Sequence, residues 1–184
     1  MDTIQELSPE LIRDEARAFF GAYRDIRRPH HTSETQFVCY YAPALVCGTF
    51  SLELYLKCLR VLDGHPIKKG HDPSRLFAGL ADSTQKRIAD AWSRRLPNAP
   101  AMTPETVKAA LEPLDGAFER WRYLFEHQTL AGSLALVDVA LLAVQQTLAE
   151  TRPDWFPAGT TELLDWRRDL MASVAFTQLP GSGR

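Results

Sequence analysis

The chain has 184 residues, of which 45% are hydrophobic and 24% are charged, and its formal net charge is −2. This composition is typical of one folded domain with an apolar core, and it excludes a disordered tail and a minimal disulfide scaffold. Because the charge is close to neutral, it argues neither for nor against a nucleic-acid partner.

Helix-start signals and apolar periodicity predict two long helices at the beginning of the chain. Ser8-Pro9-Glu10 places a capping hydroxyl before a proline at the first helical position, and apolar residues then recur at 3.6-residue spacing. A second helix is expected from Ser33 or Thr35 to Asp63-Gly64, where glycine is the usual terminator. This helix is expected to kink or split at its two breaker residues, Pro43 and Gly48.

Further helices are expected at residues 72–80, 82–96, 103–125, 133–150 and 161–174. Asp72-Pro73 caps the first of these, and Thr103-Pro104-Glu105 repeats the start signal found at Ser8. The helix that begins at Thr103 is expected to be jogged at Pro113 or Gly116.

The whole chain lacks alternating strand patterns bounded by hairpin turns. We therefore predict an all-α fold, a bundle of five to seven helices with an up-and-down core and short extra helices. Residues 1–176 are expected to form a single domain, and residues 177–184 a flexible tail.

Cysteine spacing and the N-terminal sequence indicate a cytoplasmic protein. Cys39, Cys47 and Cys58 are 8 and 11 residues apart on one predicted helix. Eight helical residues rise about 12 Å, beyond the reach of roughly 7 Å for a disulfide, so we expect reduced thiols. The N-terminus has no signal pattern, and the apolar run from Leu134 to Val144 is short for a membrane span.

The second predicted helix is apolar around nearly its whole circumference from Phe50 to Leu62, which is typical of a helix at the centre of a bundle. Its polar positions form one stripe, Thr49, Glu53, Lys57 and Arg60. We expect Glu53 and Lys57 to form an ion pair that is partly buried or faces a groove. Two interpretations remain open, an ordinary surface pair and a polar cluster that positions a ligand or a second charged helix.

Two more segments carry chemistry-bearing residues. In residues 121–127, Arg122 and Glu126 lie one helical turn apart and are placed to meet Glu53 and Lys57 in crossed fashion. The alternative is a core aromatic stripe in which Arg122 only neutralises Glu53. Gly70-His71-Asp72 precedes a helix N-terminus, so capping alone explains Asp72, and His71 is a candidate functional residue.

Three motifs, taken together, resemble the HEPN domain, a helical nucleotide-binding module of higher eukaryotes and prokaryotes. They are Phe50-Ser51-Leu52-Glu53-Leu54-Tyr55-Leu56-Lys57, then Gly70-His71-Asp72, then Arg122-Tyr123-Leu124-Phe125-Glu126. The resemblance covers roughly residues 8–150. It implies a helical bundle, homodimers and a place in toxin–antitoxin or phage-defence systems.

Many members of that family are metal-independent endoribonucleases with an Arg, four to six residues, and then a His. Arg122 and His127 have this spacing and lie on the helix that matches. Other pairs also have the spacing: Arg24 with His30 or His31, Arg60 with His65, and Arg120 with His127. Other members lack the motif, so the alternative is a non-catalytic module that binds RNA, a nucleotide or a partner protein such as a nucleotidyltransferase antitoxin.

If the pair is catalytic, Arg122 binds the phosphate and His127 transfers a proton, with no metal and no cofactor. The expected supporting cluster is Glu53, Lys57, Tyr123, Glu126, His71 and Asp72. One histidine does not easily serve both sides of a phosphorus atom, so we expect a homodimer that brings two copies of His127 into one cleft.

Overall fold

The computed structural model describes residues 8–27, 37–67, 69–96, 99–116 and 134–156. These residues form six α-helices and two short 3-10 helices, and none of them is in a strand. The elements are α1 (Pro9–Arg27), α2 (Phe37–Leu62), α3 (Pro73–Phe77), α4 (Asp82–Ser93), α5 (Pro104–Leu111), η1 (Glu112–Leu114), α7 (Leu134–Thr151) and η3 (Pro153–Trp155). The prediction of an all-α protein is therefore confirmed for the described part of the chain.

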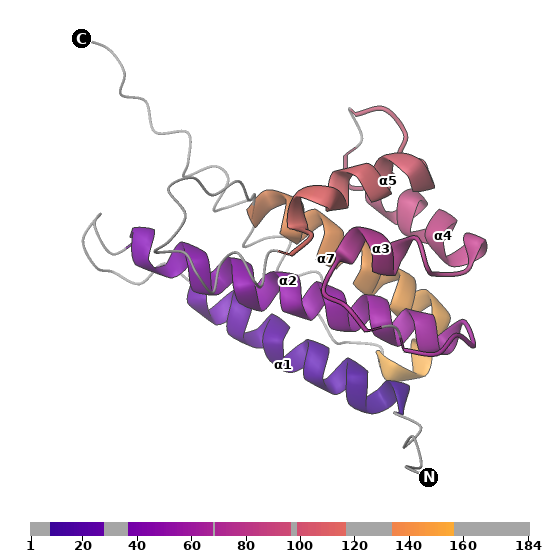
Figure 1. Cartoon of the computed structure of the whole chain (residues 1–184), viewed down its shortest axis with the longest axis horizontal. Helices are drawn as coiled ribbons and strands as arrows, with labels where there is room; N and C mark the ends of the chain where they lie inside the picture. Colours follow the sequence, from indigo (N-terminus) through magenta and orange to yellow (C-terminus); the bar gives the residue numbers. More distant parts are fainter. Residues whose placement is uncertain (1–7, 28–36, 68, 97–98, 117–133, 157–184) are drawn as a thin grey trace.

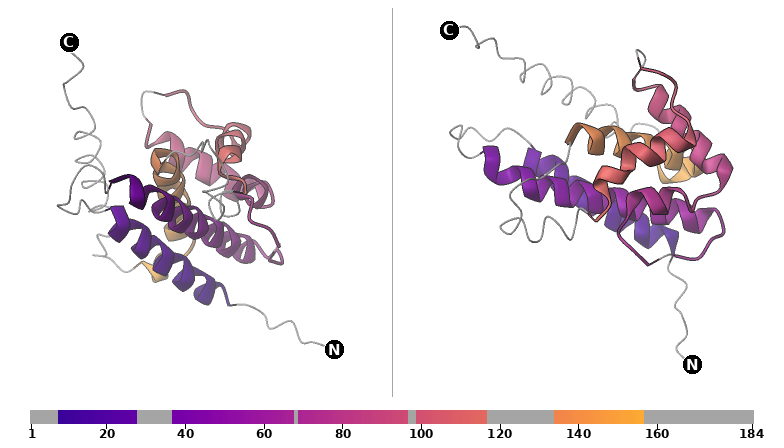
Figure 2. Two further views of the ribbon diagram at one scale, coloured as in Figure 1. Left: turned by 60° about the vertical axis from the view of Figure 1, so that its left-hand side comes forward. Right: turned by 45° about the horizontal axis from the view of Figure 1, so that its top comes forward.

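Helix α2 lies at the centre of this arrangement. It packs along α1, which runs in the opposite direction, and it also contacts α7 and α3 (Figures 1 and 2). Helix α4 packs on α7, and α5 contacts both α3 and α4. The apolar circumference of α2 explains its position, because Leu52, Leu56 and Cys58 are completely buried.

The predicted split of α2 is wrong, because α2 is one continuous helix of 26 residues with Pro43 inside it. Proline removes a single backbone hydrogen bond, and it does so here near the first turns of a long helix, where the loss is local. Gly48 has a packing role instead. A Cβ there would lie 2.7 Å from Cγ1 of Val137 and 2.9 Å from Cε2 of Tyr23, so glycine lets α1, α2 and α7 approach closely.

Several helix boundaries follow the local signals in the sequence. The backbone N–H of Glu10 donates to the Ser8 hydroxyl at 3.2 Å, and α1 begins at Pro9 as predicted. Thr103 and Thr106 form a capping box at the start of α5, with backbone-to-hydroxyl distances of 2.7 and 3.3 Å. Gly64, with φ of +79°, follows the end of α2 as the expected terminator.

The start of α4 depends on a residue from another helix end. Its N-cap is Ala81, which has no capping side chain. Asp63, just after α2, accepts hydrogen bonds from the Ala81 N–H at 2.8 Å and from the Thr84 hydroxyl at 2.7 Å. This carboxylate satisfies donors at the start of α4 and ties it to the end of α2.

The helix predicted over residues 103–125 is described as far as Gly116, and it is interrupted after Leu111. Helix α5 stops at Leu111, and η1 follows, with Pro113 at its second position. Asp115 is then extended, and Gly116 has φ of +62°, a left-handed conformation, so the regular helix is interrupted at the positions where the jog is predicted. The rest of this predicted helix, the helix over 161–174 and the tail 177–184 lie outside the described residues, as does the end of the proposed domain.

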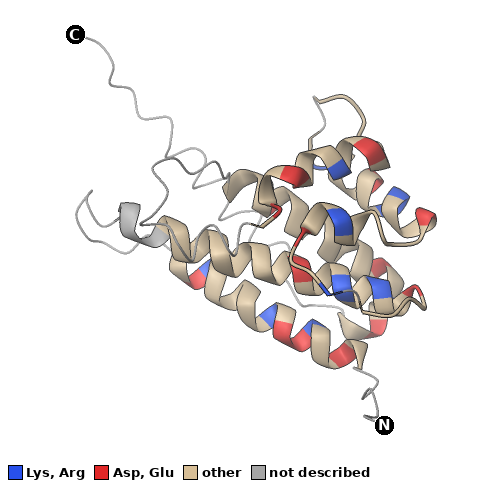
Figure 3. Cartoon of the chain, in the orientation of Figure 1, with Lys and Arg blue, Asp and Glu red and all other residues tan. Residues whose placement is uncertain are grey.

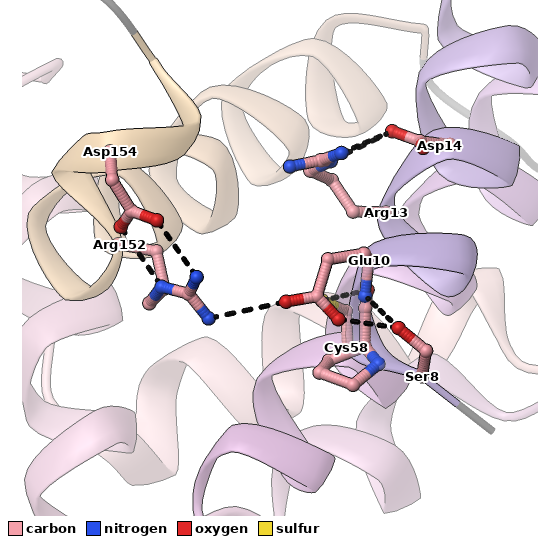
Figure 4. A network of polar contacts seen from close by, with 8 residues as sticks. Ser8, Glu10, Arg13, Asp14, Cys58, Arg152 and Asp154 are labelled. Atoms are coloured by element: carbon pink, nitrogen blue, oxygen red, sulfur yellow. Dashed lines mark hydrogen bonds and ion pairs between the residues drawn. The ribbon is translucent and has the colours of Figure 1, made fainter. Parts of the chain in front are cut away.

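A network of polar contacts connects the start of α1 with the segment that follows α7 (Figure 4). Arg152 pairs with Asp154 at 2.8 Å and with Glu10 at 3.5 Å, so it links α1 to η3. The guanidinium groups of Arg13 and Arg152 lie 4.6 and 4.2 Å from the centre of the Trp155 ring. These contacts hold η3 against the first turns of α1.

Cys47 and Cys58 are free thiols, as expected from their spacing. Cys58 is fully buried beside α1, with its sulfur 3.3 Å from the carbonyl oxygen of Pro9. Burial raises the pKa of the Cys58 thiol to about 12, so it remains protonated at neutral pH.

Helix α7 is longer than the apolar run that predicted it. Over its 18 residues, Leu134–Thr151, it is long and apolar enough to cross a membrane, with a mean hydropathy of 1.3. More than half of this segment, 56%, is buried inside the protein, as in the core helix of a bundle. One helix of this kind is a weak indication of a membrane span.

Candidate functional site

The candidate site begins with a buried carboxylate on the central helix. Glu53 is 3% exposed, although it carries a charge and lies in an apolar stretch of α2. An ionised carboxylate at such a position requires donors close by, because leaving it unpaired would cost several kcal/mol. The side chains that donate hydrogen bonds to Glu53 therefore form the candidate site together with it.

Lys57 supplies the first partner, one turn further along α2. Its Nζ lies 2.6 Å from Oε1 of Glu53, and the side chains are 14% and 3% exposed. The predicted ion pair is therefore confirmed. Of the two interpretations left open, the ordinary surface pair is wrong, because both side chains are largely buried.

His71 supplies the second partner, from the loop that returns the chain to α2. Its Nδ1 lies 3.0 Å from Oε2 and 3.2 Å from Oε1 of Glu53, across 18 residues of sequence. Gly70, with φ of +129°, makes the backbone turn that precedes His71. The histidine side chain is 46% exposed, so one part of the ring lies on the buried carboxylate and another meets solvent.

The contact with Glu53 determines which ring nitrogen of His71 carries a hydrogen. An ionised carboxylate only accepts hydrogen bonds, so Nδ1 must be the donor. In the neutral ring, Nε2 is then the atom without hydrogen. Glu53 thus orients His71 in the way that a carboxylate orients a catalytic histidine.

Asp72 does not join this cluster, and the prediction that capping explains it is wrong. It occupies the N-cap position of α3 but makes no capping hydrogen bond with its side chain. It pairs instead with Arg75 at 3.3 Å on the exposed side. Asp115, from the segment after η1, takes over the capping role by accepting from the N–H of Ser74 at 2.9 Å and from the Ser74 hydroxyl.

The structure thus brings together Glu53, Lys57 and His71, which we call the Glu53 cluster. The remaining residues of the predicted site, Arg122, Tyr123, Glu126 and His127, lie outside the described residues. The predicted crossing of Arg122 and Glu126 with Glu53 and Lys57 therefore remains a prediction. Among the described residues, no group of three His, Cys, Asp or Glu side chains is placed to hold a metal ion.

A second buried polar cluster, not predicted from the sequence, joins α1 to α7. Tyr23 and Arg27 both donate to Oδ1 of Asp138, and Arg27 also donates to the Tyr23 hydroxyl at 2.8 Å. Asp138 is 1% exposed, and its Oδ2 is a buried acceptor with no hydrogen-bond partner among the described residues. The one sequence signal for this cluster is that Asp138 interrupts the apolar run of α7.

Burial changes the titration of this second cluster. It raises the pKa of Asp138, and the positive charge of Arg27 and the bond from Tyr23 offset that effect only in part. Burial and the neighbouring Asp138 charge also hold the pKa of Tyr23 well above its usual range. Because Tyr23 and Asp138 are both enclosed, this cluster acts as a buried link between helices.

Charges elsewhere are mixed. Figure 3 shows Lys and Arg interspersed with Asp and Glu along the described helices. Two arginines just after α4 bond to side chains of α7: Arg94 pairs with Glu150 at 3.1 Å, and Arg95 donates to Gln146 at 2.8 Å. The Glu53 cluster differs from these charges by the burial of Glu53 and by its contact with a histidine.

Comparison with known proteins finds no relative of this chain. No protein-family model matches the chain, and no curated protein and no solved structure matches it. Arguments about function therefore rest on the residues themselves.

Proposed function

We propose that this chain acts on RNA as a metal-independent endoribonuclease of the HEPN type, within a toxin–antitoxin or phage-defence system. One observation carries the proposal: Glu53, Lys57 and His71, which come from two of the three motifs that resemble the family, lie in contact although 18 residues separate Glu53 from His71. The burial of Glu53 supports it further, because a charge is placed in an apolar helix at a cost in stability that function can explain.

In this proposal the third motif supplies the reacting groups. The 2′-hydroxyl of the RNA attacks the adjacent phosphorus, and the bond to the 5′-oxygen of the next nucleotide breaks. Arg122 donates two parallel hydrogen bonds to the phosphate oxygens and stabilises their growing negative charge. One copy of His127 in the proposed dimer takes the proton of the 2′-hydroxyl, and the other copy gives a proton to the departing 5′-oxygen. The products are a 2′,3′-cyclic phosphate and a 5′-hydroxyl, and no metal takes part.

The supporting residues orient the arginine. Glu53 with Lys57, and Tyr123 with Glu126, are the groups that we propose hold Arg122 in place for the phosphate. We also propose a homodimer, in which a second copy of the motif lies across the two-fold axis. Light scattering at micromolar concentration tests this part, and a strict monomer would overturn it.

The decisive experiment is cleavage of a mixed RNA pool in EDTA by the wild type, His127→Ala and Arg122→Ala. Cleavage by the wild type alone, leaving 2′,3′-cyclic phosphate ends, is the expected result. Cleavage that persists in His127→Ala would assign the activity to another residue or to a contaminant. Inactivity of the wild type, with its fold and oligomeric state intact, would overturn the proposal.

The second candidate function is a non-catalytic module that binds a partner protein, such as a nucleotidyltransferase antitoxin, or binds RNA or a nucleotide. The observation that favours it is that a buried Glu53–Lys57 pair also suits a purely structural polar core. Under this alternative, Arg122→Ala lowers the melting temperature, whereas His127→Ala changes neither stability nor growth arrest on expression.

A further inference from the structure

We draw no further inference here: the strongest candidate, the outward face of α1 with the exposed residues Leu11, Ala18, Gly21 and Ala22, carries none because nothing in the structure shows what covers it.

Discussion

The two helical glycines Gly21 and Gly48 are expected to respond to alanine with opposite signs. At Gly48 a Cβ would lie 2.7 Å from Val137 and 2.9 Å from Tyr23, where ordinary carbon contacts are about 3.5–4.0 Å, so each neighbour must move by roughly 1 Å. Neither neighbour gives way easily. Both are completely buried, and the Tyr23 hydroxyl is held by Asp138 and Arg27. Overpacking of this kind costs about 1–3 kcal/mol.

Alanine also favours the helix by about 1 kcal/mol relative to glycine. The net expectation for Gly48→Ala is a loss of up to about 2 kcal/mol in the free energy of unfolding. A Cβ on Gly21 meets no atom within 4 Å, so Gly21→Ala should gain about 0.5–1 kcal/mol. Urea unfolding followed by circular dichroism measures both. A Gly48→Ala variant as stable as Gly21→Ala would refute the close approach of the three helices.

Three further expectations concern the buried polar groups. Glu53→Leu should lower the free energy of unfolding by about 3 kcal/mol, because it leaves the Lys57 ammonium without its carboxylate. The double variant Glu53→Leu with Lys57→Met should recover most of that loss. Equal losses for the single and the double variant in urea unfolding would contradict the buried pair. Cys58, whose thiol pKa is raised to about 12 by burial, should escape iodoacetamide at about pH 8 until urea unfolds the chain, as followed by site-resolved mass spectrometry. Asp138 has a raised pKa in the fold, so the native state holds its proton more tightly than the unfolded chain does. The stability of the wild type relative to Asp138→Asn should therefore fall as the pH rises from about 3.9 toward that raised value, and a difference that does not vary with pH would contradict this.

Burial by itself does not mark a functional site in this molecule. Asp138 and Glu53 are both charged residues on apolar helices, and both are at least 97% buried. Asp138 is enclosed with Tyr23 and Arg27, whereas Glu53 holds a histidine that is half exposed. The difference is access, because a group can act on a substrate only where part of the cluster meets solvent.

The sequence by itself determined the features that depend on neighbours within about four residues. The start of α1 at Ser8-Pro9, the capping box at Thr103 and the end of α2 before Gly64 follow from local backbone hydrogen bonds and dihedral preferences. The Glu53–Lys57 pair follows from helical spacing in the same way. The all-α class and the central place of α2 follow from apolar periodicity.

Only the tertiary structure decided which distant residues meet. The contact of His71 with Glu53 spans 18 residues, that of Asp115 with Ser74 spans 41, and that of Tyr23 with Asp138 spans 115. These groups meet because α3 and α7 pack on the central helix α2, and no local sequence pattern predicts that packing. A buried polar atom must find a donor or acceptor wherever packing brings one near. For that reason the direct contact between Glu53 and His71, which the sequence places in one expected cluster without a geometry, is defined only by the fold.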